Sequence, residues 1–311
     1  MNKSFAIGGV VIRELYRRKD FYVLLVLTAV ITGLLGAVNF FNDPRIVRYL
    51  KEICLLLIWL SSLVICITTA ARQIPAEKEN RTIFPLLAKP VTRWQVVFGK
   101  FLGCWLACGI ALLVFYLFFA IVSESRGRDD ADDPPAAAAV QTGETNTGAI
   151  TGAQGGESAK AHGEPGHVHG EHCQHGTSED HSAWLNYLQA LWLHWLMLGV
   201  VTAMVLFGSV VFTAPSSNTT ITFIGVLGIL LLGEHLHKVA LRQEEPVQTI
   251  LSVIYFMIPH LEWYDIRDRV IYDHAAVAWG PMGLVTLYAV AYAGLFLFLA
   301  WLVFRRKGLT T

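Results

Sequence analysis

The residues of this 311-residue chain that are best suited to chemistry fall into two groups. The first group holds six histidines and one cysteine between residues 162 and 181, and neutral imidazole and thiolate are good ligands for zinc or copper. The candidate metal ligands are His167, His169, His172, Cys173 and His175. Their spacing is irregular, so two interpretations stay open: a metal-binding segment, or a low-complexity loop without a specific role.

The second group lies in residues 72–100, named the elbow below, between two long apolar runs. Charged residues alternate there with apolar residues at helical spacing. Pro90 and Thr92 mark the end of one helix and the start of the next, with Thr92 as the N-cap. A compact helix pair that is polar on one side and apolar on the other suits the docking of a soluble partner.

The elements that position these groups follow from the composition. Hydrophobic residues make up 54% of the chain and charged residues 15%, against about 25% charged in ordinary soluble domains. About 20 apolar residues are needed for a helix to cross a bilayer core, and backbone groups in lipid must be satisfied within each segment. We therefore predict an all-α polytopic membrane protein of about six transmembrane helices. The predicted spans are residues 21–41, 53–71, 101–123, 184–212, 219–232 and 277–304.

The domain organisation follows from the same pattern. Residues 1–20 form a cytoplasmic amphipathic segment, 21–122 the first three spans with the elbow, and 184–311 the last three spans. Residues 123–183 hold few large apolar side chains, so we expect a disordered extracytoplasmic loop. Residues 237–276 are expected to form short outer helices before the last span. Basic residues concentrate near the elbow and both termini, which places both termini in the cytoplasm.

The elbow sequence resembles a known family. An acidic residue precedes Asn-Arg-Thr-Ile, and Lys-Pro-Val-Thr-Arg-Trp and Gly-Lys-Phe-Leu-Gly follow. This pattern is similar to that of type 2 ABC exporter (ABC-2) permeases, and within them to subunits related to copper-reductase maturation and gliding motility. Many relatives carry glycine where this chain has Arg81.

The resemblance implies a permease subunit of the bacterial plasma (inner) membrane that couples ATP hydrolysis by a separate subunit to transport. ATP and Mg²⁺ belong to that ABC ATP-binding subunit, and a second permease copy or homologue completes the assembly in the lipid bilayer. The matching residues, which would couple to the ATPase, are Glu77, Arg81, Thr82, Lys89, Pro90, Arg93, Gly99 and Lys100.

Other functions are less compatible with the residues. Phe98-Gly99-Lys100-Phe101 lacks the glycines and the hydroxyl residue of a phosphate loop, so we expect no catalytic site and no cofactor bound by this chain apart from zinc or copper. A formal net charge of zero gives no reason to expect nucleic acid as a partner. The alternative is a stand-alone metal-ion transporter that collects ions on the histidine-rich loop. Such transporters place ionisable residues within their spans, where this chain has mainly His194.

Overall fold

A computed structural model describes residues 3–17, 19–37, 44–79, 92–132, 176–240, 247–272 and 276–306. Every regular element in these ranges is a helix, as the apolar runs predict. The elements are α1 (Lys3–Tyr16), α2 (Lys19–Ala37), α3 (Pro44–Ala71), α4 (Pro75–Glu79), α6 (Arg93–Asp132), α8 (Gly176–Val211), α9 (Pro215–Ala240), α10 (Val247–Met257), the 3-10 helix η1 (Leu261–Tyr264), α11 (Arg267–Ile271) and α12 (Trp279–Arg306).

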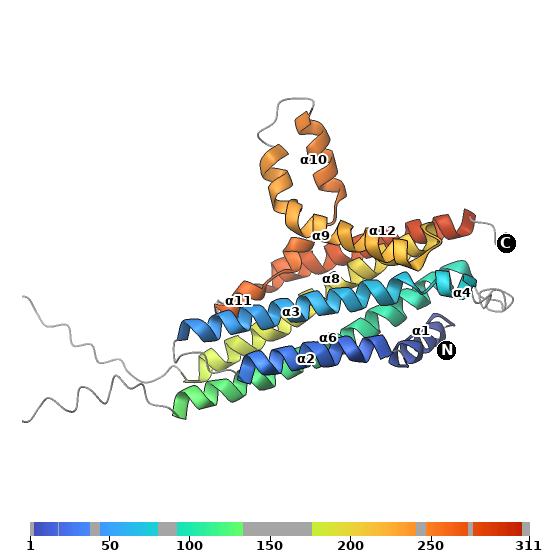
Figure 1. Cartoon of the computed structure of the whole chain (residues 1–311). Helices are drawn as coiled ribbons and strands as arrows, with labels where there is room; N and C mark the ends of the chain where they lie inside the picture. The colour runs from blue at the N-terminus through green and yellow to red at the C-terminus, as the bar shows by residue number, and fades with distance from the viewer. Residues whose placement is uncertain are drawn as a thin grey trace, which may run out of the picture.

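Long apolar helices that run side by side form the body of the molecule (Figure 1). In the described residues, α2, with 19 residues, lies where the first span is predicted, and the shorter apolar stretch Pro215–Leu231 lies where the fifth is predicted. The second, third, fourth and sixth predictions coincide with four stretches that are long and apolar enough to cross a membrane: Lys51–Glu77, Arg93–Ile121, Trp184–Val211 and Trp279–Arg306. The chain is therefore an all-α polytopic membrane protein.

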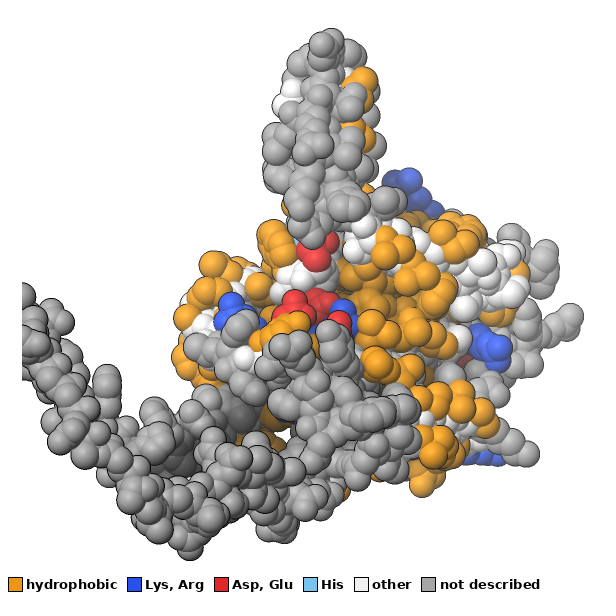
Figure 2. All heavy atoms as spheres, turned by 60° about the vertical axis from the view of Figure 1, so that its left-hand side comes forward, with side chains coloured by type: hydrophobic (Ala, Val, Ile, Leu, Met, Phe, Trp, Pro, Cys, Tyr) orange, Lys and Arg blue, Asp and Glu red, His pale blue; other side chains and the backbone are white. Residues whose placement is uncertain are grey.

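Apolar side chains cover the flanks of this bundle, where lipid would lie. Leu117, Ile121, Leu284 and Leu287 are each more than half exposed. Figure 2 brings forward the end opposite the elbow and shows charged side chains gathered there among apolar ones. An apolar flank with charges near one end is the distribution expected of a protein in a bilayer.

The helices of the third and fourth spans are longer than predicted. α6 begins at Arg93 instead of residue 101 and continues to Asp132, and α8 begins at Gly176 instead of residue 184. Residues 123–132 and 176–183, which we predicted as parts of a disordered loop, are therefore helical. Extending an existing helix adds one hydrogen bond for each residue fixed and requires no new nucleus, so polar residues can prolong an apolar helix.

A reciprocal tryptophan pair joins α6 to α8, the most buried of the long apolar stretches in the described residues. The rings of Trp105 and Trp195 stack with centroids 4.5 Å apart. The Trp105 indole N–H donates to the Trp195 carbonyl at 2.9 Å, and the Trp195 N–H donates to the Trp105 carbonyl at 3.3 Å. A β-carbon at Gly109 would collide with the Trp195 indole, and one at Gly199 with the Trp105 indole. Each helix thus places its own Trp-Leu-x-x-Gly sequence against that of the other.

The segment before the last span forms the short helices α10, η1 and α11, as predicted, but residues 237–240 belong to the end of α9. The last part of α9 and α10 make a hairpin that projects sideways, whereas the first part of α9 lies along the bundle against α3 and α8 (Figure 1). Next to α10, the His260 ring lies 4.3 Å from the Tyr255 ring and 5.0 Å from the Trp263 ring, measured between centroids. The backbone N–H of His260 donates to the Tyr288 hydroxyl at 2.9 Å, which fastens this segment to α12.

Replacing Gly109 by alanine is expected to lower the free energy of unfolding by about 1–3 kcal/mol, because the added methyl group forces the Trp195 indole out of its stack. The measurement is an SDS titration of the purified protein in mixed micelles. Gly294→Ala on α12 is the control, since nothing lies within 4 Å of a β-carbon there. Equal destabilisation by both substitutions would contradict the close contact.

Candidate functional site at the elbow

A buried ion pair joins the first helix of the elbow, α4, to α6. Lys100 Nζ lies 2.7 Å from Glu77 Oε1 and donates to the Gln73 carbonyl at 2.8 Å. The Lys100 side chain is 1% exposed and that of Glu77 is 31% exposed. Leaving a buried ammonium without its partner costs on the order of 3–5 kcal/mol, so α4 is held where its carboxylate meets Lys100.

The turn between α3 and α4 presents the Gln73 carbonyl to Lys100. The Gln73 N–H donates to the Ala70 carbonyl at 3.3 Å, and the Ala76 N–H donates to the Arg72 carbonyl at 3.0 Å. Carbonyls just after a helix end have no partner within the helix, and a cation there also interacts favourably with the helix dipole. Lys100 therefore satisfies the end of α3 and the carboxylate of α4 with one ammonium group.

The second helix of the elbow is the start of α6. The Thr92 N–H donates to Gln95 Oε1 at 3.1 Å, and the Gln95 N–H donates to Thr92 Oγ1 at 3.4 Å. This reciprocal pair is a capping box, which confirms Thr92 as the N-cap. Gly99 and Lys100, predicted at the opening of the third helix, lie within α6 instead, because the capped helix begins at Arg93.

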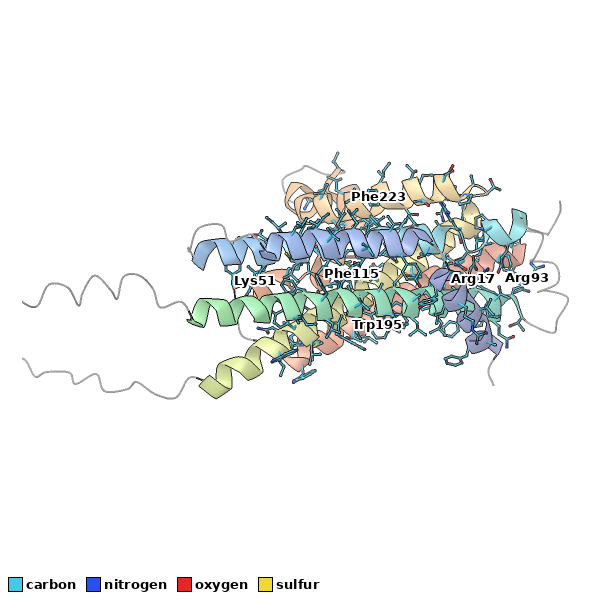
Figure 3. The ribbon with its side chains drawn as sticks, turned by 60° about the horizontal axis from the view of Figure 1, so that its bottom comes forward. Arg17, Lys51, Arg93, Phe115, Trp195 and Phe223 are labelled. Atoms are coloured by element: carbon cyan, nitrogen blue, oxygen red, sulfur yellow. The ribbon has the colours of Figure 1, made fainter. Side chains whose placement is uncertain are left out.

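Arg93 fastens the start of α6 to the end of α12. Its Nη1 donates to the carbonyls of Phe304 at 2.8 Å and Arg305 at 2.9 Å, and its guanidinium lies 5.7 Å from the centroid of the Phe304 ring. Arginine side chains commonly satisfy the last carbonyls of a helix in this way. Figure 3 places Arg93 and Arg17 at one end of the bundle and Lys51 at the other. The former is named the elbow end below.

Two glycines let α1 lie directly against α6. A β-carbon at Gly99 would lie 2.8 Å from the Ser4 carbonyl oxygen, and one at Gly103 would lie 2.8 Å from the Gly8 carbonyl oxygen. Their G-x-x-x-G spacing puts both on one face of α6, as in close helix pairs within membranes. Neighbouring residues thus act on different faces of α6: Gly99 admits α1 and Lys100 holds α4.

The structure describes four of the predicted coupling residues. Glu77 and Lys100 contact each other, whereas Arg93 and Gly99 contact α12 and α1. Arg81, Thr82, Lys89 and Pro90 lie outside the described residues. Sequence reasoning missed Gln73, Gly8 and Gly103. The spacing of Gly99 and Gly103 was a usable signal, but Gln73 contributes only its backbone carbonyl, which no residue type reveals.

The candidate metal ligands between residues 167 and 175 also lie outside the described residues, so the metal-binding interpretation stays a prediction. Among the side chains that the structure describes, no group of three or more His, Cys, Asp or Glu is placed to hold a metal ion. Cys104 and Cys108, one turn apart on α6, are buried in the core of the bundle.

A second polar cluster lies within the bundle around His194. The Ser62 hydroxyl donates to the Trp59 carbonyl at 2.9 Å, so its oxygen accepts from His194 Nε2 at 2.8 Å. His194 Nδ1 is then free to accept from the Tyr116 hydroxyl, 3.5 Å away. The imidazole thereby joins α3, α6 and α8.

Comparison with known proteins places the chain in a family. Residues 53–309 match the profile of a family described as ABC-2 family transporter protein, from within α3 to beyond the end of α12. The chain belongs to this family. No curated protein matches it. The match confirms the resemblance seen in the elbow and leaves the copper-reductase and gliding-motility groups unassigned. This ABC-2 protein is a multi-pass membrane permease component of an ABC transporter, in a family that generally works with a separate ATP-binding subunit.

Lys100 is far more buried than Glu77, so we expect substitutions of these two residues to lower the stability of this ABC-2 protein unequally. Glu77→Leu leaves a buried ammonium unpaired and is expected to cost about 3 kcal/mol of unfolding free energy. Lys100→Met should cost less, because the Glu77 side chain is 31% exposed and that of Lys100 only 1%, and the double variant should recover stability. SDS titration measures all three, with the exposed Arg306→Met as control. A larger cost for Lys100→Met than for Glu77→Leu would show that the pair is not organised around a buried lysine.

Proposed function

We propose that this chain is the membrane-spanning permease subunit of an ATP-driven exporter. A separate ABC subunit, which holds ATP and Mg²⁺, docks at the elbow, and two permease copies, or one copy and a homologue, enclose the path. The chain lies in the bacterial inner membrane with both termini in the cytoplasm. The basic residues near the elbow and the termini support this orientation.

The contact that carries the proposal is the ion pair between Glu77 and Lys100. It links α4 to α6. α4 belongs to the proposed docking surface, and α6 crosses the membrane. α6 in turn holds α1 through Gly99 and the end of α12 through Arg93. ATP binding favours one arrangement of the partner subunits, and a docked α4 passes that preference to α6 and its neighbours.

The stand-alone metal-ion transporter is supported less well. Its mechanism requires ionisable side chains at the membrane midplane that can exchange ions or protons. His194 lies at depth in the fourth span, but both of its ring nitrogens already have partners in Ser62 and Tyr116. Lys100 is committed to Glu77 and to the Gln73 carbonyl. These groups stabilise the bundle, and their arrangement favours the permease over the ion transporter.

Docking is tested with a photo-crosslinking residue at the exposed Arg72, at the end of α3. In cells, this position is expected to capture a protein that mass spectrometry identifies as an ABC ATP-binding subunit. The same residue at Trp184, which is 57% exposed near the opposite end of the bundle, is the control and should not capture it. If a membrane-impermeant reagent labels a cysteine at residue 72 from outside the cell, the docking surface is on the wrong side and the proposal fails.

Coupling is tested in the purified complex of permease and ATPase in nanodiscs. Because the Glu77 carboxylate faces Lys100, Glu77→Ala is expected to change the rate of ATP hydrolysis severalfold while the two subunits still co-purify. Arg81→Ala is expected to reduce co-purification itself. Wild-type hydrolysis in both Glu77→Ala and Lys100→Met would exclude the ion pair from the coupling path. Wild-type co-purification of Arg81→Ala would exclude that residue from docking.

A further inference from the structure

α1 uses only part of its surface to contact the bundle. Gly8 and Val11 lie against Gly99 and Gly103 of α6 and are buried, and Ser4 and Ile7 belong to the same face. The helix runs obliquely across α6 at the elbow end (Figure 3). On the other sides of α1 the side chains of Phe5, Val10, Arg13, Tyr16 and Arg17 are exposed.

An apolar stripe runs along one side of the contact face. Phe5 is 61% exposed and Tyr16 is 72% exposed, and with Gly9 and Ile12 they follow the spacing that aligns side chains along a helix. The Tyr16 ring meets the Tyr22 ring edge to face at 5.7 Å, where the chain enters α2. Exposing such side chains to water is unfavourable, and aromatic residues at the entry to a span belong at the lipid interface.

A basic hollow adjoins this stripe. Val10, Arg13, Glu14 and Arg17 are exposed together on the outward side of α1, where they border one open hollow. Arg13 and Arg17 are one turn apart, so their guanidinium groups can approach one phosphate together, in the forked geometry that arginine offers. Glu14 offsets one of the two charges. In the sequence, Arg18 and Lys19 directly follow Arg17. Residues 13–19 therefore carry four basic groups and one acidic group.

We propose that α1 is a docking site for an anionic phospholipid in the leaflet at the elbow end. Phe5 and Tyr16 enter the acyl-chain boundary, and Arg13 and Arg17 hold the phosphate. The net positive charge of the segment selects an anionic headgroup over a zwitterionic one. α1 packs on Gly99 and Gly103 of α6, and Lys100 lies in the same part of that helix. A lipid bound to α1 is therefore linked through α1 to the part of α6 that holds α4. The proposal does not depend on the ATPase, since lipid binding is a property of this chain alone.

The test uses the full-length chain in nanodiscs with equal amounts of phosphatidylglycerol and phosphatidylcholine. Native mass spectrometry then identifies the lipids that stay bound after release. The wild-type chain is expected to retain phosphatidylglycerol in preference to phosphatidylcholine, and R13Q/R17Q should reduce this preference severalfold. R305Q/R306Q is the matched control, since it removes two exposed charges from the elbow end outside the hollow. This control should keep the preference.

Three outcomes overturn the proposal. An equal loss in R13Q/R17Q and R305Q/R306Q shows that general positive charge, and not the hollow, attracts the lipid. An unchanged preference in R13Q/R17Q shows that the hollow does not bind it. If R13Q/R17Q fails to insert, R13K/R17K replaces it, because it keeps the charge and removes the forked geometry. R13K/R17K should then retain less phosphatidylglycerol than the wild type, and equal retention overturns the proposal.

Discussion

The burial of one ammonium group organises the elbow end of this protein. Lys100 lies on an apolar helix and is 1% exposed, so its charge must be met by protein groups. Glu77 and the Gln73 carbonyl meet it, which fixes both α4 and the turn that precedes it. Gly99 and Gly103, which contact α1, and Arg93, which contacts α12, lie in the same stretch of α6. The first turns of α6 thus serve as a common anchor for four other segments of the chain.

The helices are held together by contacts that do not depend on excluding water. In lipid, apolar side chains gain little by leaving their surroundings, so close packing and hydrogen bonds must supply the attraction between helices. The glycines at 99 and 103 bring α1 close to α6, and the glycines at 109 and 199 seat the tryptophans that join α6 to α8. Both contacts lie on α6. α6 therefore connects the elbow to the centre of the bundle through its own helical backbone.

The sequence predicted the features that single residues or regular spacing control. The apolar runs predicted the helical class and the positions of the long helices, and Thr92 predicted a cap that a capping box confirms. It did not predict the lengths of α6 and α8, because the change from apolar to polar residues marks the end of the apolar stretch and not the end of the helix, which continues through the polar residues. Nor did it predict that Lys100 meets Glu77, or that Trp105 faces Trp195, since both depend on how separate helices are placed. Glu77 and Lys100 were chosen by resemblance, and their physical link became visible only in the structure.

The extension of α6 and α8 beyond their apolar stretches has a geometric consequence for the sequence that joins them. Residues 122–132 of α6 are helical, and at about 1.5 Å per residue they add roughly 16 Å beyond the apolar stretch that ends at Ile121. The residues that follow Asp132 in the sequence, the histidines among them, are therefore joined to the apolar stretch through about three further turns of α6.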